Sequence, residues 1–95
     1  MRPVLLNDLT TAARALLWAP QAERKDLCQR ILYKADIADR FTRRVQRRHP
    51  QWGNGTLVEA IENCPLAPEP PCSDPAYCSC LTMVLQGIAA KRAKD

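Results

Sequence analysis

The stretch from Gln21 to His49 constrains the fold of this chain more than any other. Apolar residues recur along it at steps of three or four, the spacing that places side chains on one face of an α-helix. These apolar positions are Leu27, Ile31, Ala35, Ala38, Phe41 and Val45. Most arginines of the stretch fall on the opposite face. We therefore predict one long helix over residues 20–48, with the rest of the chain arranged to cover it.

The chain length and composition fit one small helical domain. With 95 residues, the chain can bury one modest core but not two. Its apolar fraction of 46% and charged fraction of 25% are typical of a soluble globular protein. Runs of Val, Ile, Thr and Tyr that would favour strands are missing from the sequence. We therefore expect residues 1–95 to form a single all-α domain.

A first helix is expected before the long one. Asn7 or Asp8 can cap its start, because their side chains accept hydrogen bonds from backbone N–H groups of the first turn. Pro20 ends this helix and can open the next. The junction is short, so the first two helices should pack as a hairpin.

Two further helices follow the long one. Thr56 and Glu59 match the capping box, in which each side chain bonds the other residue's backbone N–H. Asp74 is a good cap for the last helix, with Pro75 at its first position. The fold class we expect is all-α, a small four-helix bundle with one long central helix. The four predicted helices span residues 8–19, 20–48, 56–63 and 75–92.

Positive charge gathers near the end of the long helix. The net charge is +4, and from Arg40 to His49 there are five arginines and no acid. Such a segment can meet nucleic acid, an acidic protein or an anionic membrane. The alternative is a solvated helix face, in which Asp36 and Asp39 pair with Arg40 and Arg43 four residues later. Both interpretations stay open at this point.

The turn after the long helix contains an aromatic residue among glycines and a proline. In one interpretation, Trp52 folds back onto the core and the glycines adopt positive φ. In the other, Trp52 and His49 join the arginines in an exposed recognition surface, since aromatic residues and arginine dominate binding hot spots. The expected partner-binding residues are Arg40, Arg43, Arg44, Arg47, His49, Trp52 and Asn54.

No catalytic or metal-binding constellation is evident. The spacings of the five cysteines do not match the paired ligands of structural zinc sites, and free cysteine packs as a small apolar residue. A Cys64–Cys72 disulfide is the alternative outside a reducing compartment. The single histidine has no third group to orient it. We therefore expect that the protein is not an enzyme and that it binds no metal, no cofactor and no small-molecule substrate.

The start of the chain does not resemble a secretory signal. Asn7, Asp8 and Arg14 interrupt its apolar residues. No stretch reaches the roughly 20 apolar residues of a membrane span. We expect a cytoplasmic protein that does not enter a membrane.

Three functional hypotheses follow from these features. The leading one is a small non-enzymatic module that binds a protein partner, in which arginines steer and pair with carboxylates while Trp52 anchors. The alternative is a nucleic-acid-binding accessory protein that uses the Arg40–Arg48 face on phosphates, with affinity that falls steeply with salt. A third, a zinc-stapled module, predicts bound metal and unfolding by a chelator.

Several short segments together resemble a known protein group. They are Arg2-Pro3-Val4-Leu5, Ala35-Asp36 with Ala38-Asp39-Arg40, His49-Pro50 with Trp52-Gly53-Asn54-Gly55-Thr56-Leu57, and Asp74-Pro75-Ala76-Tyr77. The chain resembles, over most of its length, a group of short alphaproteobacterial proteins of unknown function. The resemblance implies a bacterial cytoplasmic protein and brings no activity with it.

Overall fold

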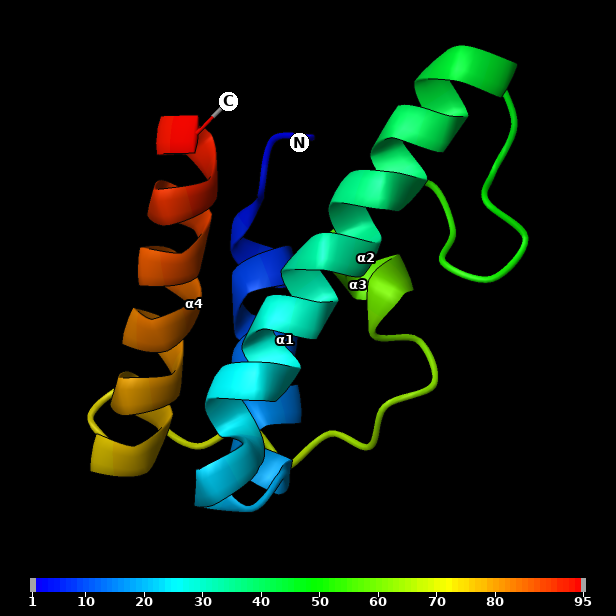
Figure 1. The fold of residues 1–95 in the computed structure, drawn as a ribbon. Helices are drawn as coiled ribbons and strands as arrows, with labels where there is room; N and C mark the ends of the chain where they lie inside the picture. Colours follow the sequence, from blue (N-terminus) through cyan, green and yellow to red (C-terminus); the bar gives the residue numbers. More distant parts are fainter. Residues whose placement is uncertain (1, 95) are drawn as a thin grey trace.

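The helices expected from the sequence pattern are present in the structure (Figure 1). The computed structural model describes residues 2–94, and in this range no residue lies in a strand. The fold class is all-α, a small four-helix bundle with a long central helix, as predicted. A short 3-10 turn, η1 (Gln21–Glu23), leads into α2. The helices are α1 (Leu6–Trp18), α2 (Arg24–Val45), α3 (Leu57–Ala60) and α4 (Pro75–Lys94).

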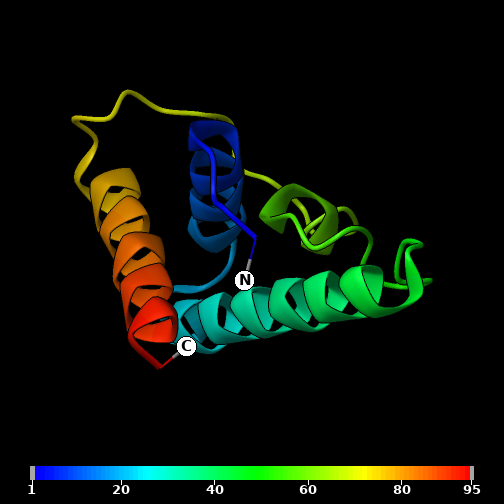
Figure 2. The same ribbon diagram turned by 90° about the horizontal axis from the view of Figure 1, so that it is seen from above.

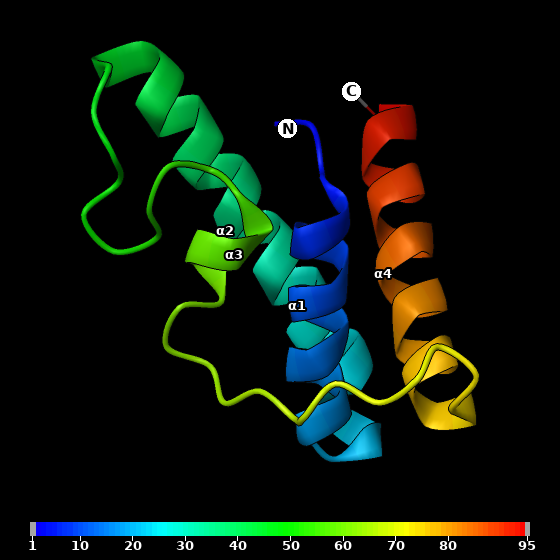
Figure 3. The same ribbon diagram turned by 180° about the vertical axis from the view of Figure 1, so that it is seen from behind.

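The four helices meet around α1, and α2 crosses over it. Seen from behind in Figure 3, α1 lies between α3 and α4, and it contacts α2, α3 and α4. The most extensive pairing is α1 with α4. In the view from above, the C-terminal half of α2, drawn in green, runs past α1 and ends in a loop of residues 46–56 (Figure 2). One end of the long helix therefore stands clear of the bundle.

The core draws side chains from all four helices. Small residues of α1, Ala12 and Ala13, are fully buried and allow close packing of its neighbours. The predicted apolar stripe of α2 is buried from Ile31 to Ala38, and Leu27 before it is half-buried. Val45, expected in the same stripe, is 43% exposed because the end of α2 projects beyond the bundle. The largest side chains that are fully buried are Tyr77, Leu16, Leu57 and Val84.

The first helix begins earlier than predicted. It starts at Leu6 rather than at residue 8, and Leu5 occupies the capping position. Asp8 stabilises this start as the third residue of the helix, because its Oδ2 accepts the Leu5 N–H at 3.0 Å. Its Oδ1 accepts the Val58 N–H of α3 at 3.3 Å. The buried Asp8 carboxylate therefore joins two helices and caps both.

The long helix is present but shorter at both ends than the predicted span 20–48. Residues 21–23 form η1, and α2 stops at Val45. Gln46 takes a left-handed conformation with φ of 57°, and its N–H donates to the Thr42 carbonyl at 2.8 Å, a common way for helices to end. The helix therefore ends five residues before Pro50, and Arg47 lies in the loop.

The third helix is a single turn, shorter than the predicted 56–63. Thr56 Oγ1 accepts the Glu59 N–H at 3.3 Å, which is one half of the predicted capping box. The other half is absent, since Glu59 Oε2 accepts the Asn54 N–H at 2.9 Å instead. The start of α4 is as predicted, with the Tyr77 N–H donating to Asp74 Oδ1 at 3.0 Å.

The proline-rich segment between α3 and α4 is tied to the bundle at two points. The Arg14 Nε–H donates to the Ala67 carbonyl at 2.8 Å, and the Ala67 N–H donates back to the Arg14 carbonyl at 3.2 Å. The buried Tyr77 hydroxyl donates to Glu69 at 3.1 Å. Burial, together with that hydrogen bond to Glu69, raises the pKa of Tyr77.

Candidate interaction surface

The seven residues expected to bind a partner lie together at the projecting end of α2. The helix carries three of them, and the loop of residues 46–56 carries the other four (Figure 2). We call this set the α2-end surface. Its contacts divide it into paired arginines, open arginines, an aromatic stack and a loop-shaping amide. Its members are Arg40, Arg43, Arg44, Arg47, His49, Trp52 and Asn54.

Two of the arginines pair with buried aspartates one turn earlier. Arg40 lies 3.0 Å from Asp36 Oδ2, and Arg43 lies 3.2 Å from Asp39 Oδ2. Both aspartates are buried, whereas both arginine side chains are about two-thirds exposed. The predicted pairing is confirmed. These arginines therefore compensate buried charge in addition to facing solvent.

The same aspartates connect α2 to distant parts of the chain. Asp36 Oδ2 lies 3.1 Å from Lys91 of α4, and Asp39 Oδ1 lies 3.6 Å from Arg2. Burial of Asp36 by itself raises the pKa of its carboxyl group. The hydrogen bond and charge of Lys91, with the charge of Arg40, outweigh burial and leave the pKa below its ordinary value. The charged carboxylate is thus the stable form in the fold.

Two other arginines carry charge that the fold leaves open. Arg44 and Arg47 are exposed, and neither lies within 4 Å of a carboxylate in the part of the chain that the structure describes. Arg48, between Arg47 and the aromatic turn, pairs with Glu59 of α3. The uncompensated charge of this surface is therefore concentrated on Arg44 and Arg47.

An aromatic stack lies beside these arginines. The His49 and Trp52 rings are parallel within 4°, with centroids 4.8 Å apart. The Phe41 ring of α2 meets the His49 ring edge-on. The two ring centroids are 5.1 Å apart, and the angle between the ring planes is 70°. Trp52 is half-buried in this stack rather than a member of the central core. The sequence placed Phe41 in the core stripe, and no local signal indicated that it supports the stack.

His49 also organises the turn that presents Trp52. Its backbone pairs with Gly53 through two hydrogen bonds of 2.8 and 3.1 Å. Its Nδ1 accepts the N–H groups of both Gln51 and Trp52, each at 3.1 Å. The side chain therefore fills the polar interior of the turn.

Asn54 shapes the loop rather than offering its side chain to a ligand. Its Oδ1 accepts the Thr56 N–H at 3.1 Å, and its own N–H donates to Glu59 at 2.9 Å. The flanking Gly53 and Gly55 have φ of +82° and +100°, which favours glycine. The prediction of positive φ at these glycines is confirmed.

The cysteines lie apart from this surface. Cys28 and Cys80 are buried between α2 and α4, and burial raises the pKa of both thiols. Cys72 and Cys78 are exposed, and Cys64 is half-buried. All five are free thiols, so the alternative Cys64–Cys72 disulfide is not formed. Within residues 2–94, no cluster of three acidic, histidine or cysteine side chains has a metal-binding arrangement.

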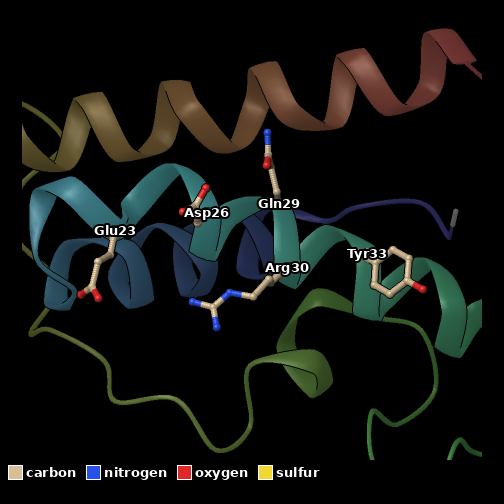
Figure 4. Close-up of a pocket in the computed structure, with 5 residues that line it drawn as sticks. All are labelled: Glu23, Asp26, Gln29, Arg30 and Tyr33. Atoms are coloured by element: carbon tan, nitrogen blue, oxygen red, sulfur yellow. The ribbon is translucent and has the colours of Figure 1, made fainter.

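A hollow lies along the N-terminal half of α2, away from the α2-end surface. It encloses about 530 Å³ and is lined by five polar or aromatic side chains of η1 and α2. Figure 4 shows these side chains spread along the helix rather than converging on one point. Such an arrangement does not assemble reacting groups around a substrate. The lining residues are Glu23, Asp26, Gln29, Arg30 and Tyr33.

Comparison with known proteins assigns the chain to a family. A family model described as "Domain of unknown function (DUF7742)" matches residues 2–88, a range that includes the whole α2-end surface. No curated protein and no solved structure matches the chain. Among the helices that the structure describes, none has the length and apolar character needed to cross a membrane.

Proposed function

The chain belongs to this family of unknown function, and we propose that it is a small non-enzymatic interaction module that binds a protein partner through the α2-end surface. One observation carries the proposal. Arg47, one of the two open arginines, precedes His49 of the stacked His49–Trp52 pair by two residues, and Arg44, the other, lies one turn after Phe41, whose ring packs on His49. All are on the end of α2 that projects beyond the bundle or in the loop that follows it. Arginine and tryptophan are the residues most enriched in binding hot spots.

The chemistry of this surface indicates what its partner presents. Arg44 and Arg47 can each form charge-assisted hydrogen bonds with a carboxylate. Trp52 offers an aromatic face for an apolar side chain next to those carboxylates. Arg40 and Arg43 add to the positive field that steers an acidic partner toward the surface. The proposed partner is therefore an acidic protein segment that carries an apolar residue.

The alternative ligand is nucleic acid, bound by the same arginines through phosphates. Of the five arginines from Arg40 to Arg48, the fold pairs three with carboxylates, namely Arg40, Arg43 and Arg48. Duplex affinity depends on the number of phosphates neutralised, with a slope of about −0.9 per phosphate against the logarithm of salt concentration. Two open arginines supply few such contacts, which favours a protein partner.

We also infer that the protein works in a bacterial cytoplasm. The His49–Thr56 segment supports this origin through its resemblance to alphaproteobacterial sequences. Five free thiols, two of them exposed to solvent, suit a reducing compartment.

Partner capture with charge-reversed variants tests the proposal. The wild-type protein and the double variant Arg44→Glu/Arg47→Glu are immobilised and exposed to nuclease-treated bacterial extract. The matched control is Lys25→Glu/Arg30→Glu, which makes the same charge change at exposed positions near the other end of α2. We expect proteins retained by the wild type and the control to be lost from Arg44→Glu/Arg47→Glu and from Trp52→Ala. Equal retention by all variants would contradict the proposal.

A further inference from the structure

The turn that presents Trp52 depends on one unprotonated nitrogen. We propose that protonation of His49 opens this turn and releases Trp52 from its stack, so that the α2-end surface changes shape with pH. The functional meaning of this switch rests on the proposed function. The switch itself is a property of residues 49–53 and can be measured without a partner.

The hydrogen bonds of the turn require a neutral imidazole. Nδ1 of His49 accepts two backbone N–H groups, from Gln51 and Trp52, at 3.1 Å each. An imidazole nitrogen accepts only while it carries no proton, so the ring must hold its single proton on Nε2. The His49–Gly53 backbone pair closes the turn around this nitrogen. One side-chain atom thus satisfies two N–H groups that the turn leaves without another acceptor in the described structure.

Protonation would turn this contact from attractive to repulsive. An N–H group at Nδ1 would face the Gln51 and Trp52 N–H groups, and both would lose their acceptor. The parallel Trp52 ring would gain attraction for an imidazolium, which opposes opening. The attraction between the two rings does not require the closed turn. The closed turn, in contrast, would hold the N–H groups of His49 Nδ1, Gln51 and Trp52 against one another. We therefore expect the backbone to open.

The charged groups around the turn are mostly basic. Arg47 and Arg48 immediately precede His49 in the chain, and Arg44 lies one turn earlier at the end of α2. The carboxylate on the α3 side is Glu59, which packs against Gly53. Glu59 already accepts from Arg48 and from the Asn54 N–H. A protonated His49 would therefore add positive charge to an already basic loop.

The chain offers a clean test because it has a single histidine. Histidine is the side chain whose ordinary titration falls between about pH 5 and 8. The fluorescence of Trp52 is isolated by changing the exposed Trp18 to phenylalanine. The N–H groups of Gln51 and Trp52 are followed by NMR of ¹⁵N-labelled protein across this pH range.

Two variants separate the acceptor from the ring. His49→Asn keeps an acceptor oxygen near the position of Nδ1 but has no titrating group. His49→Phe keeps a stacking ring but has no acceptor. If the inference is right, His49→Asn shows no pH transition in the Gln51 and Trp52 amide signals. His49→Phe should show the open turn at every pH.

In the wild type we expect one transition that tracks His49 protonation. Amide protection at Gln51 and Trp52, corrected for the intrinsic effect of pH on exchange, should fall about tenfold at the acid end. Trp52 emission should change over the same range. The inference is overturned if both amides stay protected when His49 is protonated, or if His49→Phe keeps them protected. Because no partner takes part, these outcomes are independent of the capture experiment.

Discussion

The backbone of Gly55 lies directly against Asp39 of α2. A Cβ atom added to Gly55 would come within 2.6 Å of Asp39 Cβ and 2.7 Å of its Cα. Gly55 also has φ of +100°, a conformation that L side chains rarely adopt. This contact returns the loop of residues 46–56 to the helix it has just left. It thereby fixes where the aromatic stack and the open arginines are presented.

The first prediction concerns this contact. Gly55→Ala should lower the free energy of unfolding by about 2–5 kcal/mol, because backbone strain adds to a clash with helix backbone that cannot move. Gly87→Ala is the control, since its Cβ would meet the terminal Cδ1 of Leu32 at 2.7 Å and Cys28 Sγ at 3.6 Å, and both are side-chain atoms rather than backbone. We expect that control to cost clearly less in urea unfolding. An equal loss in both variants would show that the Gly55 contact has no special role.

Much of the helical scaffold could be predicted from local patterns. The stripe through Ile31, Ala35 and Ala38 and the Asp74-Pro75 start of α4 are features of neighbouring residues, and the structure confirms them. The end of α2 was predicted wrongly. Contacts between residues distant in sequence, such as that of Gly55 with Asp39, hold the loop against the helix, and no local pattern reports them.

The candidate site was predictable in its residues but not in its contacts. The spacing of Asp36 and Arg40 predicted their ion pair, and the structure confirms it. The spacing did not indicate that Asp36 is buried or that it has a second cationic partner. That partner, Lys91, comes from α4, which is distant in sequence. Nor could composition show that His49 Nδ1 accepts hydrogen bonds inside its own turn. These features depend on how elements meet in space.

The second prediction concerns the double cap made by Asp8. Asp8→Ala removes the acceptor of two N–H groups, those of Leu5 and Val58. We expect it to reduce the free energy of unfolding by about 1–3 kcal/mol. The neighbouring exposed Asn7, the other cap expected from sequence, is the matched control, and Asn7→Ala should change stability by less than about 0.5 kcal/mol. Chemical denaturation compares the free energies of unfolding of the two variants. A larger loss of stability in Asn7→Ala than in Asp8→Ala would show that Asn7, not Asp8, is the cap.

The third prediction is a pH dependence that arises from Asp36. Its pKa is lowered in the fold, so the unfolded chain takes up this proton at a higher pH than the folded chain does. The stabilisation is therefore fully present above the ordinary value of 3.8 and is lost as pH falls through the folded pKa. Wild-type protein should lose more stability than Asp36→Asn between about pH 5 and pH 2. The exposed Asp26→Asn variant should keep the wild-type acid dependence, and an identical slope in all three would refute this role of Asp36.

The fourth prediction concerns the thiols. In the native protein, Cys72 and Cys78 should react quickly with a thiol reagent because they are exposed. Cys28 and Cys80 should react only after unfolding, since they are buried and their raised pKa disfavours the thiolate. Alkylation at neutral pH followed by peptide mass spectrometry gives the order in which the cysteines react. Rapid native labelling of Cys28 would mean that the α2–α4 contact opens readily.

The measurement that tests the central claim most directly is site-specific photo-crosslinking in living bacteria. A photoreactive phenylalanine analogue replaces Trp52, and in a control it replaces Tyr33, which is 58% exposed on α2 but lies outside the α2-end surface. The account predicts a discrete protein adduct from position 52 that is weak or absent from position 33 and is lost with Arg44→Glu/Arg47→Glu. An adduct with nucleic acid, or protein adducts of equal yield from both positions, would contradict it.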